Sequence, residues 1–198
     1  MQQRHATAAV IGAGDFVGGA IAKKFAAAGF NVFAGRRNGD KLAPLAAEIE
    51  GAGGRVVARA LDARKEDEIA AFVRDADRRA PLEVCIFNVG ANVNFPIFDT
   101  TERVFRKVWE MACNGGFLVG REAARYMVPR GRGCIAGVDT AWVRDRIREH
   151  EGDEAIKNLD PGRLMGPDAV AESYWQLYKQ ARDAWTFEQE IRPFGEKW

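Results

Sequence analysis

The stretch VIGAGDFVGGAIAKKF, residues 10–25, decides how the chain folds. An apolar run leads into a turn that contains Gly12, Gly14 and Gly18, and apolar residues then recur with helical spacing. Glycines at such a junction allow a tight turn and let backbone N–H groups approach a phosphate, whose charge the helix N-terminus favours. The stretch therefore predicts a phosphate-binding turn, although a bare glycine turn in another kind of α/β protein remains an alternative.

Short apolar runs alternate with longer amphipathic segments through the first two-thirds of the chain. Such alternation indicates right-handed crossovers and a doubly wound, Rossmann-like α/β fold, in which helices cover both faces of a parallel sheet. A chain of 198 residues is long enough for a single domain of this kind, spanning 1–198. The expected strands are 6–11, 31–35, 55–60, 82–89 and 133–137, and the expected helices are 15–28, 41–50, 66–79 and 101–127.

This alternation stops after the fifth expected strand. Residues 138–181 contain no second β-branched run and predict loops and helices, the last of them near 167–181, and only 185–191 alternates like a final strand. Because adjacent parallel strands need a crossover between them, we expect that about one β-α-β unit is missing here. Residues 1–137 would then form a dinucleotide-binding half, and 138–198 the remnant of a C-terminal substrate half.

The composition restricts the partners that the chain can have. Its formal net charge is +1, with acidic and basic residues interspersed, so the electrostatic signature of a nucleic-acid or membrane-surface protein is missing. No apolar run reaches transmembrane length. The three cysteines lack metal-ligand spacing and there are only two histidines, so we expect reduced core thiols, no metal site and a cytoplasmic location.

Three later segments extend the pattern that begins at the glycine turn. LDAR follows the third expected strand, IFNVGAN ends the fourth, and VDTAWV follows the fifth. In this order the segments resemble the short-chain dehydrogenase/reductase family, which has a glycine-rich first turn, an aspartate after the third strand and an Asn-Ala-Gly turn after the fourth. This chain has Phe16 where the family usually has its middle glycine, and Val89 in place of the alanine.

The resemblance covers nearly the whole chain and implies an NAD(P)-binding site. Asp62 would meet the adenine, Asn88 would begin the turn after the fourth strand, and Thr140 would lie near the carboxamide and diphosphate of the cofactor. The residues expected to bind the cofactor are Gly12, Gly14, Asp15, Phe16, Val17, Gly18, Arg36, Arg37, Asp62, Ala63, Asn88, Val89, Gly90 and Thr140.

The end of the second expected strand bears on the choice of cofactor. Family members that prefer NAD have an acidic residue here, whereas this chain has Gly35 followed by Arg36 and Arg37. A carboxylate would repel a 2′-phosphate, and an arginine can pair with one through two hydrogen bonds. We therefore expect NADP(H) to be preferred, with Arg36 as the main contact, while NAD(H) stays open. Two solvated loop arginines are the alternative interpretation.

The family's catalytic residues are missing from the sequence. The resemblance implies a tyrosine that exchanges a proton with the substrate, a lysine four residues later, and a serine at the preceding strand end. The only serine is Ser173, and Ala112 aligns with the asparagine that the family has in its long helix. We therefore predict no catalytic residue and place the missing unit near residues 136 and 137. The residues four places after Tyr126, Tyr174 and Tyr178 are Arg130, Tyr178 and Arg182.

Four functional interpretations stay open. The chain is a short-chain dehydrogenase whose turnover of a small carbonyl or alcohol substrate is absent or very slow, or it is a non-catalytic module that senses NADP(H) or assembles with an intact paralogue. Alternatively it is a fragment without independent function, or Cys134, Asp139 or His150 supplies the proton. Loss of the helix that usually pairs with the long helix would expose apolar surface, so we also expect a homo-oligomer, with a marginally stable monomer as the alternative.

Overall fold

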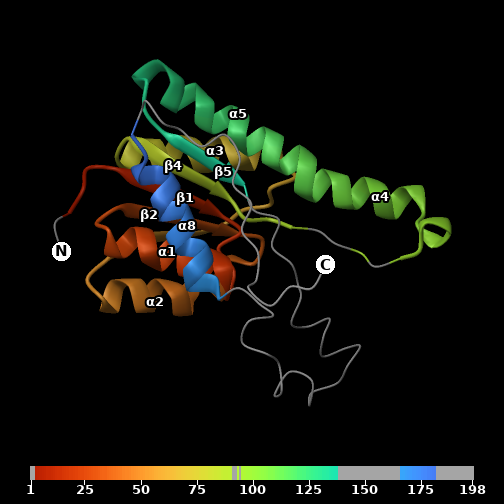
Figure 1. The fold of residues 1–198 in the computed structure, drawn as a ribbon, viewed down its shortest axis with the longest axis horizontal. Coiled ribbons are helices and arrows are strands. Elements are labelled where there is room, and N and C mark those ends of the chain that lie inside the picture. The colour runs from red at the N-terminus through yellow and green to blue at the C-terminus, as the bar shows by residue number, and fades with distance from the viewer. Residues whose placement is uncertain (1–2, 91–92, 94, 138–165, 182–198) are drawn as a thin grey trace, which may run out of the picture.

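A computed structural model describes residues 3–90, 93, 95–137 and 166–181 of the chain. Five parallel strands form one sheet in this part, and they lie in the order β3-β2-β1-β4-β5 (Figure 1). This confirms the expected α/β fold with a parallel sheet. The elements in chain order are β1 (Thr7–Ile11), α1 (Val17–Ala27), β2 (Asn31–Arg36), η1 (Gly39–Leu42), α2 (Ala43–Gly51), β3 (Arg55–Ala60), α3 (Glu66–Arg79), β4 (Leu82–Phe87), η2 (Ile97–Asp99), α4 (Glu102–Trp109), η3 (Glu110–Asn114), α5 (Gly115–Met127), η4 (Val128–Arg130), β5 (Cys134–Gly137) and α8 (Pro167–Lys179).

Helices cover both faces of the sheet, as the near-continuous apolar character of β1 and β4 requires (Figure 1). On one face, Phe25 of α1 and Tyr174 of α8 pack in a single core cluster with Val10 of β1. On the other face, Phe72 of α3 and Val119 of α5 form a second core cluster with strand residues such as Phe33 of β2. The C-terminal helix α8 therefore belongs to the same layer as α1.

Most element boundaries agree with the expected ones, and the differences concern the loops at the site. The first helix begins at Val17, so Asp15 and Phe16 belong to the preceding turn. The fourth strand ends at Phe87, which leaves Asn88 and Val89 in the loop that follows. The strand expected at 185–191 lies outside the described residues.

The expected long helix at 101–127 is continuous but is not uniformly α-helical. The side chain of Thr101 caps it by accepting a hydrogen bond from the backbone N–H of Val104 over 3.3 Å. A π-helical turn, η3, separates α4 from α5 and inserts one extra residue into the helix. None of the side chains of α4 is buried, and Figure 1 shows α4 extending beyond the sheet.

The sheet topology positions a crevice beside β1. The chain runs outward from β1 through β2 to β3 and then returns to form β4 on the other side of β1. The loops after β1 and β4 therefore diverge, and in doubly wound folds ligands bind between two such loops. Among the described residues, no helix is both long and apolar enough to cross a membrane.

Candidate functional site

The glycine turn after β1 is packed too closely for side chains at two positions. Gly12 has a φ of +85°, and a Cβ added to it would lie 2.2 Å from the backbone oxygen of Asn88. A Cβ added to Gly18, in the first turn of α1, would lie 2.2 Å from the backbone oxygen of Gly12. The close approach of β1, α1 and the loop after β4 thus depends on these two glycines.

Backbone hydrogen bonds tie the glycine turn to the strands on both sides. The N–H groups of Gly12 and Ala13 donate to the carbonyl of Gly35 in β2, over 2.8 and 3.1 Å. On the other side, the backbone N–H of Asn88 donates to the carbonyl of Ile11 over 2.7 Å, and its buried side-chain amide donates to the carbonyl of Gly12 over 3.0 Å. The turn is therefore held firmly at the ends of β1, β2 and β4.

A cavity of about 600 Å³ opens beside this turn. In the described part of the chain, basic side chains of the lining outnumber acidic ones by four to one: Arg36, Arg37, Lys41 and Arg64 against Asp62. Such a lining favours an anionic ligand, and the volume is in the range of ligand pockets. The lining residues are Ile11, Gly12, Gly14, Arg36, Arg37, Asn38, Lys41, Leu61, Asp62, Ala63, Arg64, Asn88, Val89, Gly90 and Met111.

Arg36, at the end of β2, connects the cavity to the glycine turn. Its Nη1 donates to Oδ1 of Asp15 over 2.8 Å and, more weakly, to the carbonyl of Lys41 over 3.5 Å. Asp15 is not itself part of the cavity lining. The guanidinium of Arg36 therefore lies at the edge of the cavity with a carboxylate of the same protein beside it.

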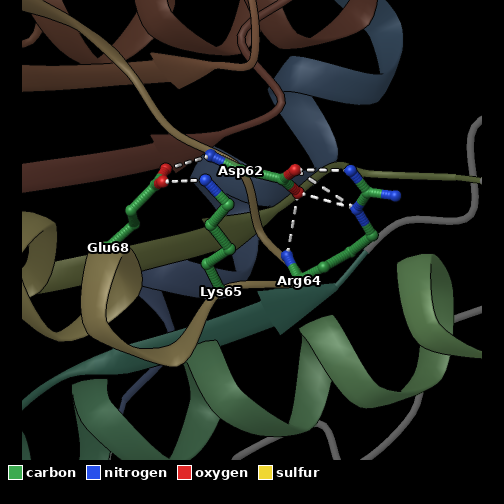
Figure 2. Close-up of polar contacts among 4 residues, drawn as sticks. All are labelled: Asp62, Arg64, Lys65 and Glu68. Atoms are coloured by element: carbon green, nitrogen blue, oxygen red, sulfur yellow. Dashed lines mark hydrogen bonds and ion pairs between the residues drawn. The ribbon is translucent and has the colours of Figure 1, made fainter.

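Asp62, which follows β3, is held by Arg64 (Figure 2). The Nε and Nη2 atoms of Arg64 donate to Oδ1 and Oδ2 of Asp62 over 2.9 and 2.5 Å, and the backbone N–H of Arg64 donates to Oδ1 over 3.1 Å. The hydrogen bonds from the guanidinium lower the pKa of Asp62 to about 2, although partial burial acts in the opposite direction. Asp62 is therefore an ionised hydrogen-bond acceptor at the cavity.

The loop that carries Asp62 is anchored to the start of α3. Glu68 accepts a hydrogen bond from the backbone N–H of Asp62 over 2.9 Å and another from Nζ of Lys65 over 2.7 Å (Figure 2). A carboxylate in the first turn of a helix is also favoured by the helix dipole. These contacts position the Asp62–Arg64 pair.

The structure brings together most of the residues expected at the site. Four of the expected residues do not line the cavity: Asp15, Phe16, Val17 and Gly18. Of these, Gly18 packs against the backbone of Gly12, and Phe16 is exposed to solvent. Thr140 lies outside the described residues. The expected residues that do line the cavity are Gly12, Gly14, Arg36, Arg37, Asp62, Ala63, Asn88, Val89 and Gly90.

Sequence reasoning missed several lining residues. Asn38 and Lys41 belong to the polar run RRNGDK after β2, and Arg64 ends the LDAR segment, so the basic residues in both segments were an available signal. Met111 lies in η3, and no local pattern predicts that this part of the helix reaches the cavity.

The three tyrosines all lie within the described residues, and none of them lines the cavity. Tyr126 is on α5 and packs against the core. Tyr174 on α8 is buried, which raises its pKa to about 12. The hydroxyl of Tyr178 donates to Oε2 of Glu83 over 2.7 Å and accepts from Nη1 of Arg4 over 3.1 Å. All three tyrosines therefore pack or form hydrogen bonds within the protein, away from the cavity.

Other groups considered as proton donors or metal ligands give no second site. Cys134 is in β5, outside the cavity lining, and burial raises the pKa of its thiol. Asp139 and His150 lie outside the described residues. In the part of the chain that the structure describes, no three His, Cys, Asp or Glu side chains are grouped so that they could hold a metal ion.

Comparisons with known proteins agree with this architecture. A model of the short chain dehydrogenase family matches residues 6–141. A galactitol 2-dehydrogenase (L-tagatose-forming) of Cereibacter sphaeroides is 31% identical over 183 residues, which take up 85% of this chain and 71% of that protein. A gluconate 5-dehydrogenase of Gluconobacter oxydans (strain 621H) is 28% identical over 162 residues, and the chain spans 63% of the length of that relative.

Solved structures extend the similarity to three dimensions. A short-chain dehydrogenase from Rhodopseudomonas palustris is 56% identical, with a TM-score of 0.81, and the match covers 96% of this chain and 100% of that one. A metagenomic short-chain oxidoreductase in complex with NADP has the same fold, at 24% identity and a TM-score of 0.78. With the family model matching well over half of the residues, the chain belongs to the short-chain dehydrogenase family.

Proposed function

We propose that this chain binds NADP(H) in the cavity beside the glycine turn and has little or no oxidoreductase turnover. One observation carries the proposal: the cavity has the basic lining of a nucleotide site, whereas none of the three tyrosines reaches it. The residues that would hold the cofactor are therefore present, and the family's proton donor is not.

The basic residues around Arg36 support a preference for NADP(H) over NAD(H). Arg36, Arg37 and Lys41 lie together at the end of β2, where a 2′-phosphate would add charge to the ribose. Among the described residues of the lining, Asp62 is the only acidic one, and it is already paired with Arg64. A phosphomonoester with two negative charges gains more from such a lining than a ribose hydroxyl does.

The environments of the tyrosines support the absence of turnover. In this family a lysine lowers the pKa of the catalytic tyrosine, whereas burial raises the pKa of both Tyr174 and Tyr178 in this chain. A general acid or base works best with a pKa near the operating pH and within hydrogen-bond reach of the substrate. Tyr174 and Tyr178 meet neither condition, because their pKa values are raised and neither residue lines the cavity.

The course of the chain after β5 supports a missing β-α-β unit. β5 is an edge strand of the described sheet, and the next described element, α8, packs on the α1 face. The match to the galactitol 2-dehydrogenase covers 85% of this chain but only 71% of that relative, so part of the relative has no aligned counterpart here. We propose that the family's catalytic segment belongs to that part.

The proposal is tested by measuring binding and turnover separately. Isothermal titration calorimetry on the full chain should give saturable binding of NADPH, about tenfold tighter than that of NADH, because charged hydrogen bonds to a 2′-phosphate contribute on the order of 1.5 kcal/mol. Arg36→Gln should remove most of this preference. Failure of the chain to bind either cofactor would contradict the proposal and favour a fragment without function.

Turnover is tested with the same protein preparation. A panel of aldehydes and ketones is offered with NADPH, and gluconate and galactitol are offered with NADP, because two relatives are named for these substrates. We expect no saturable change in cofactor absorbance above the rate without protein. Saturable, cofactor-dependent turnover of any of these compounds would show that another group replaces the tyrosine.

We also propose that the chain forms a homo-oligomer through α4 and α5. Phe105 and Trp109 are four residues apart on α4, and Phe117 follows on α5. Their exposed fractions are 65%, 48% and 61%, which is unusual for large apolar side chains on one continuous helix. Burial of this surface against a second copy would remove it from water.

A further inference from the structure

The ion pair between Asp15 and Arg36 places a carboxylate of the protein where a ligand phosphate would bind. The Asp15 side chain belongs to the glycine turn and the Arg36 side chain to the end of β2, and the pair joins these two segments over 2.8 Å. Asp15 is 68% exposed, whereas Arg36 is only 21% exposed. The arginine is therefore held in place by its surroundings, while the carboxylate is free to turn toward solvent.

The guanidinium of Arg36 does not have all of its donors available to a ligand. Nη1 contacts both Oδ1 of Asp15 and the carbonyl of Lys41. An arginine binds a phosphate best through two parallel N–H groups, so a carboxylate on one of these nitrogens competes for the same donor. A phosphate that approached while Asp15 stayed in place would also meet a like charge at short range.

We propose that Asp15 weakens the preference for NADP(H) by competing with the 2′-phosphate of the cofactor for Arg36. This inference rests on the proposed function, because it concerns the same nucleotide site. Asp15 weakens binding of a 2′-phosphorylated nucleotide and leaves an unphosphorylated one nearly unaffected. The residue therefore narrows the margin by which the chain prefers NADP(H) to NAD(H).

The exposure of Asp15 limits the size of this effect. Ion pairs at exposed positions contribute little, since solvent screens them and the side chains lose freedom on pairing. A phosphate, with up to two negative charges, displaces a single exposed carboxylate from the arginine. Asp15 thus reduces the affinity for the 2′-phosphate without preventing binding.

A different role for Asp15 leads to the opposite result. An acidic side chain near the ribose can accept hydrogen bonds from the sugar hydroxyls, and its removal would then weaken nucleotides that lack the 2′-phosphate. The two roles are separated by comparing adenine nucleotides that differ in this phosphate, namely 2′,5′-ADP and 5′-AMP.

The experiment is calorimetric titration of the full chain with 2′,5′-ADP and 5′-AMP at low ionic strength. Asp15→Asn should lower the dissociation constant for 2′,5′-ADP by about fivefold and change that for 5′-AMP by less than about twofold. Added salt should shrink the gain, because the competing interaction is electrostatic. Asp15 is exposed and outside any regular element, so the variant keeps its fold.

Two further variants isolate the direct contact. Asp40→Asn removes the same charge from another exposed residue, in η1 next to Lys41, and should leave both dissociation constants unchanged. In an Arg36→Gln background, Asp15→Asn should no longer tighten 2′,5′-ADP, since coupled residues are non-additive. An equal gain from Asp40→Asn, or a gain that persists without Arg36, would overturn the inference.

The outcomes also separate this inference from the proposed function. If the unmodified chain binds both nucleotides and Asp15→Asn changes neither constant, only the competition is wrong. A weaker constant for 5′-AMP in Asp15→Asn likewise overturns the competition in favour of a hydrogen bond to the ribose. If neither the unmodified chain nor Asp15→Asn binds either nucleotide, the proposed function fails, and the inference fails with it.

Discussion

The side-chain amide of Asn88 donates a hydrogen bond to the backbone carbonyl of Gly12 over 3.0 Å. This contact joins the loop after β4 to the loop after β1, and residues of both loops line the cavity together with residues that follow β2 and β3. Both partners are packed closely, because even a Cβ at Gly12 would meet the Asn88 backbone. The site is thus formed by a tertiary contact between residues 76 positions apart in the sequence.

Replacing Asn88 by alanine should destabilise the fold and weaken NADPH binding. The carbonyl of Gly12 would lose one of its two donors and keep the N–H of Gly14, which costs about 1 kcal/mol of unfolding free energy. Urea denaturation measures this loss, and calorimetry measures the affinity. The matched control is Asn38→Ala, an exposed residue of the same cavity lining, which should change stability by less than about 0.5 kcal/mol. Equal losses in the two variants would show that the Asn88 contact has no special role.

Adding a methyl group at Gly18 should disrupt the glycine turn. A Cβ there would lie 2.2 Å from the Gly12 oxygen and 2.8 Å from the Ala13 Cα, both of them backbone atoms that cannot move independently. We expect Gly18→Ala to lower the thermal unfolding midpoint by several degrees, which is the effect of about 1–2 kcal/mol in a chain of this size. Differential scanning calorimetry gives the midpoint directly.

Gly120→Ala is the control for this substitution, because a Cβ at Gly120 of α5 has no atom within 4 Å. Alanine is the better helix former by about 1 kcal/mol, so this variant should be as stable as the unmodified chain or more so. A Gly18→Ala variant that melts no lower than Gly120→Ala would mean that the turn adapts to the extra atom.

Much of the fold could be predicted because its signals are local. Strands buried on both faces need apolar runs, and Leu82–Phe87 has such a run. The helix at Glu66–Arg79 places Ile69, Phe72, Val73 and Ala76 on one buried face, which its spacing already indicates. The glycines of the first turn likewise predict its position, because few other residues fit between a strand and a helix that lie so close.

The contacts that complete the site could not be predicted, since they depend on distant or competing partners. Arg64 is only two residues from Asp62, but this closeness in the sequence does not decide that the two side chains pair, and nothing local indicates that Arg36 pairs with Asp15, 21 residues away. The π-helical turn at Glu110–Asn114 could not be predicted either, because its one extra residue does not interrupt the helical spacing of the sequence. The pairing of Arg36 with Asp15 is decided by the packing of the glycine turn against the end of β2, which no local pattern describes.

Charged residues in place of the exposed aromatic residues of α4 should yield a monomer. Phe105→Asp with Trp109→Asp places two charges in the surface that we propose is buried between copies, where burying an unpaired charge is costly. None of the α4 side chains is buried within one copy, so the fold of the variant should be unchanged. Light scattering after size-exclusion chromatography measures the mass.

Lys107→Glu serves as the control, because it changes the charge of an exposed α4 residue without removing an apolar side chain. It should retain the oligomeric mass of the unmodified chain. If the unmodified chain is itself a monomer at the concentrations of the calorimetric experiments, the proposed oligomer is wrong.

The pairing of Asp62 with Arg64 should appear in the acid denaturation of the chain. The pKa of Asp62 falls from 3.8 in the unfolded chain to about 2 in the folded one, chiefly through the hydrogen bonds of Arg64. Because the folded pKa is the lower of the two, the pair stabilises the fold above the unfolded value and loses this effect as the pH falls toward the folded value. The stability attributable to Asp62 should therefore disappear between these two pKa values.

Arg64→Gln removes the cause of the shift and should return the pKa of Asp62 toward its usual value. Carboxyl NMR titration then follows Asp62 directly, and urea denaturation at several pH values shows a shallower loss of stability on acidification than in the unmodified chain. Arg106→Gln, which disrupts an exposed pair with Glu102 on α4, should leave the titration of Asp62 unchanged. A low pKa that persists in Arg64→Gln would mean that other groups near the cavity, Arg37 among them, hold the carboxylate ionised.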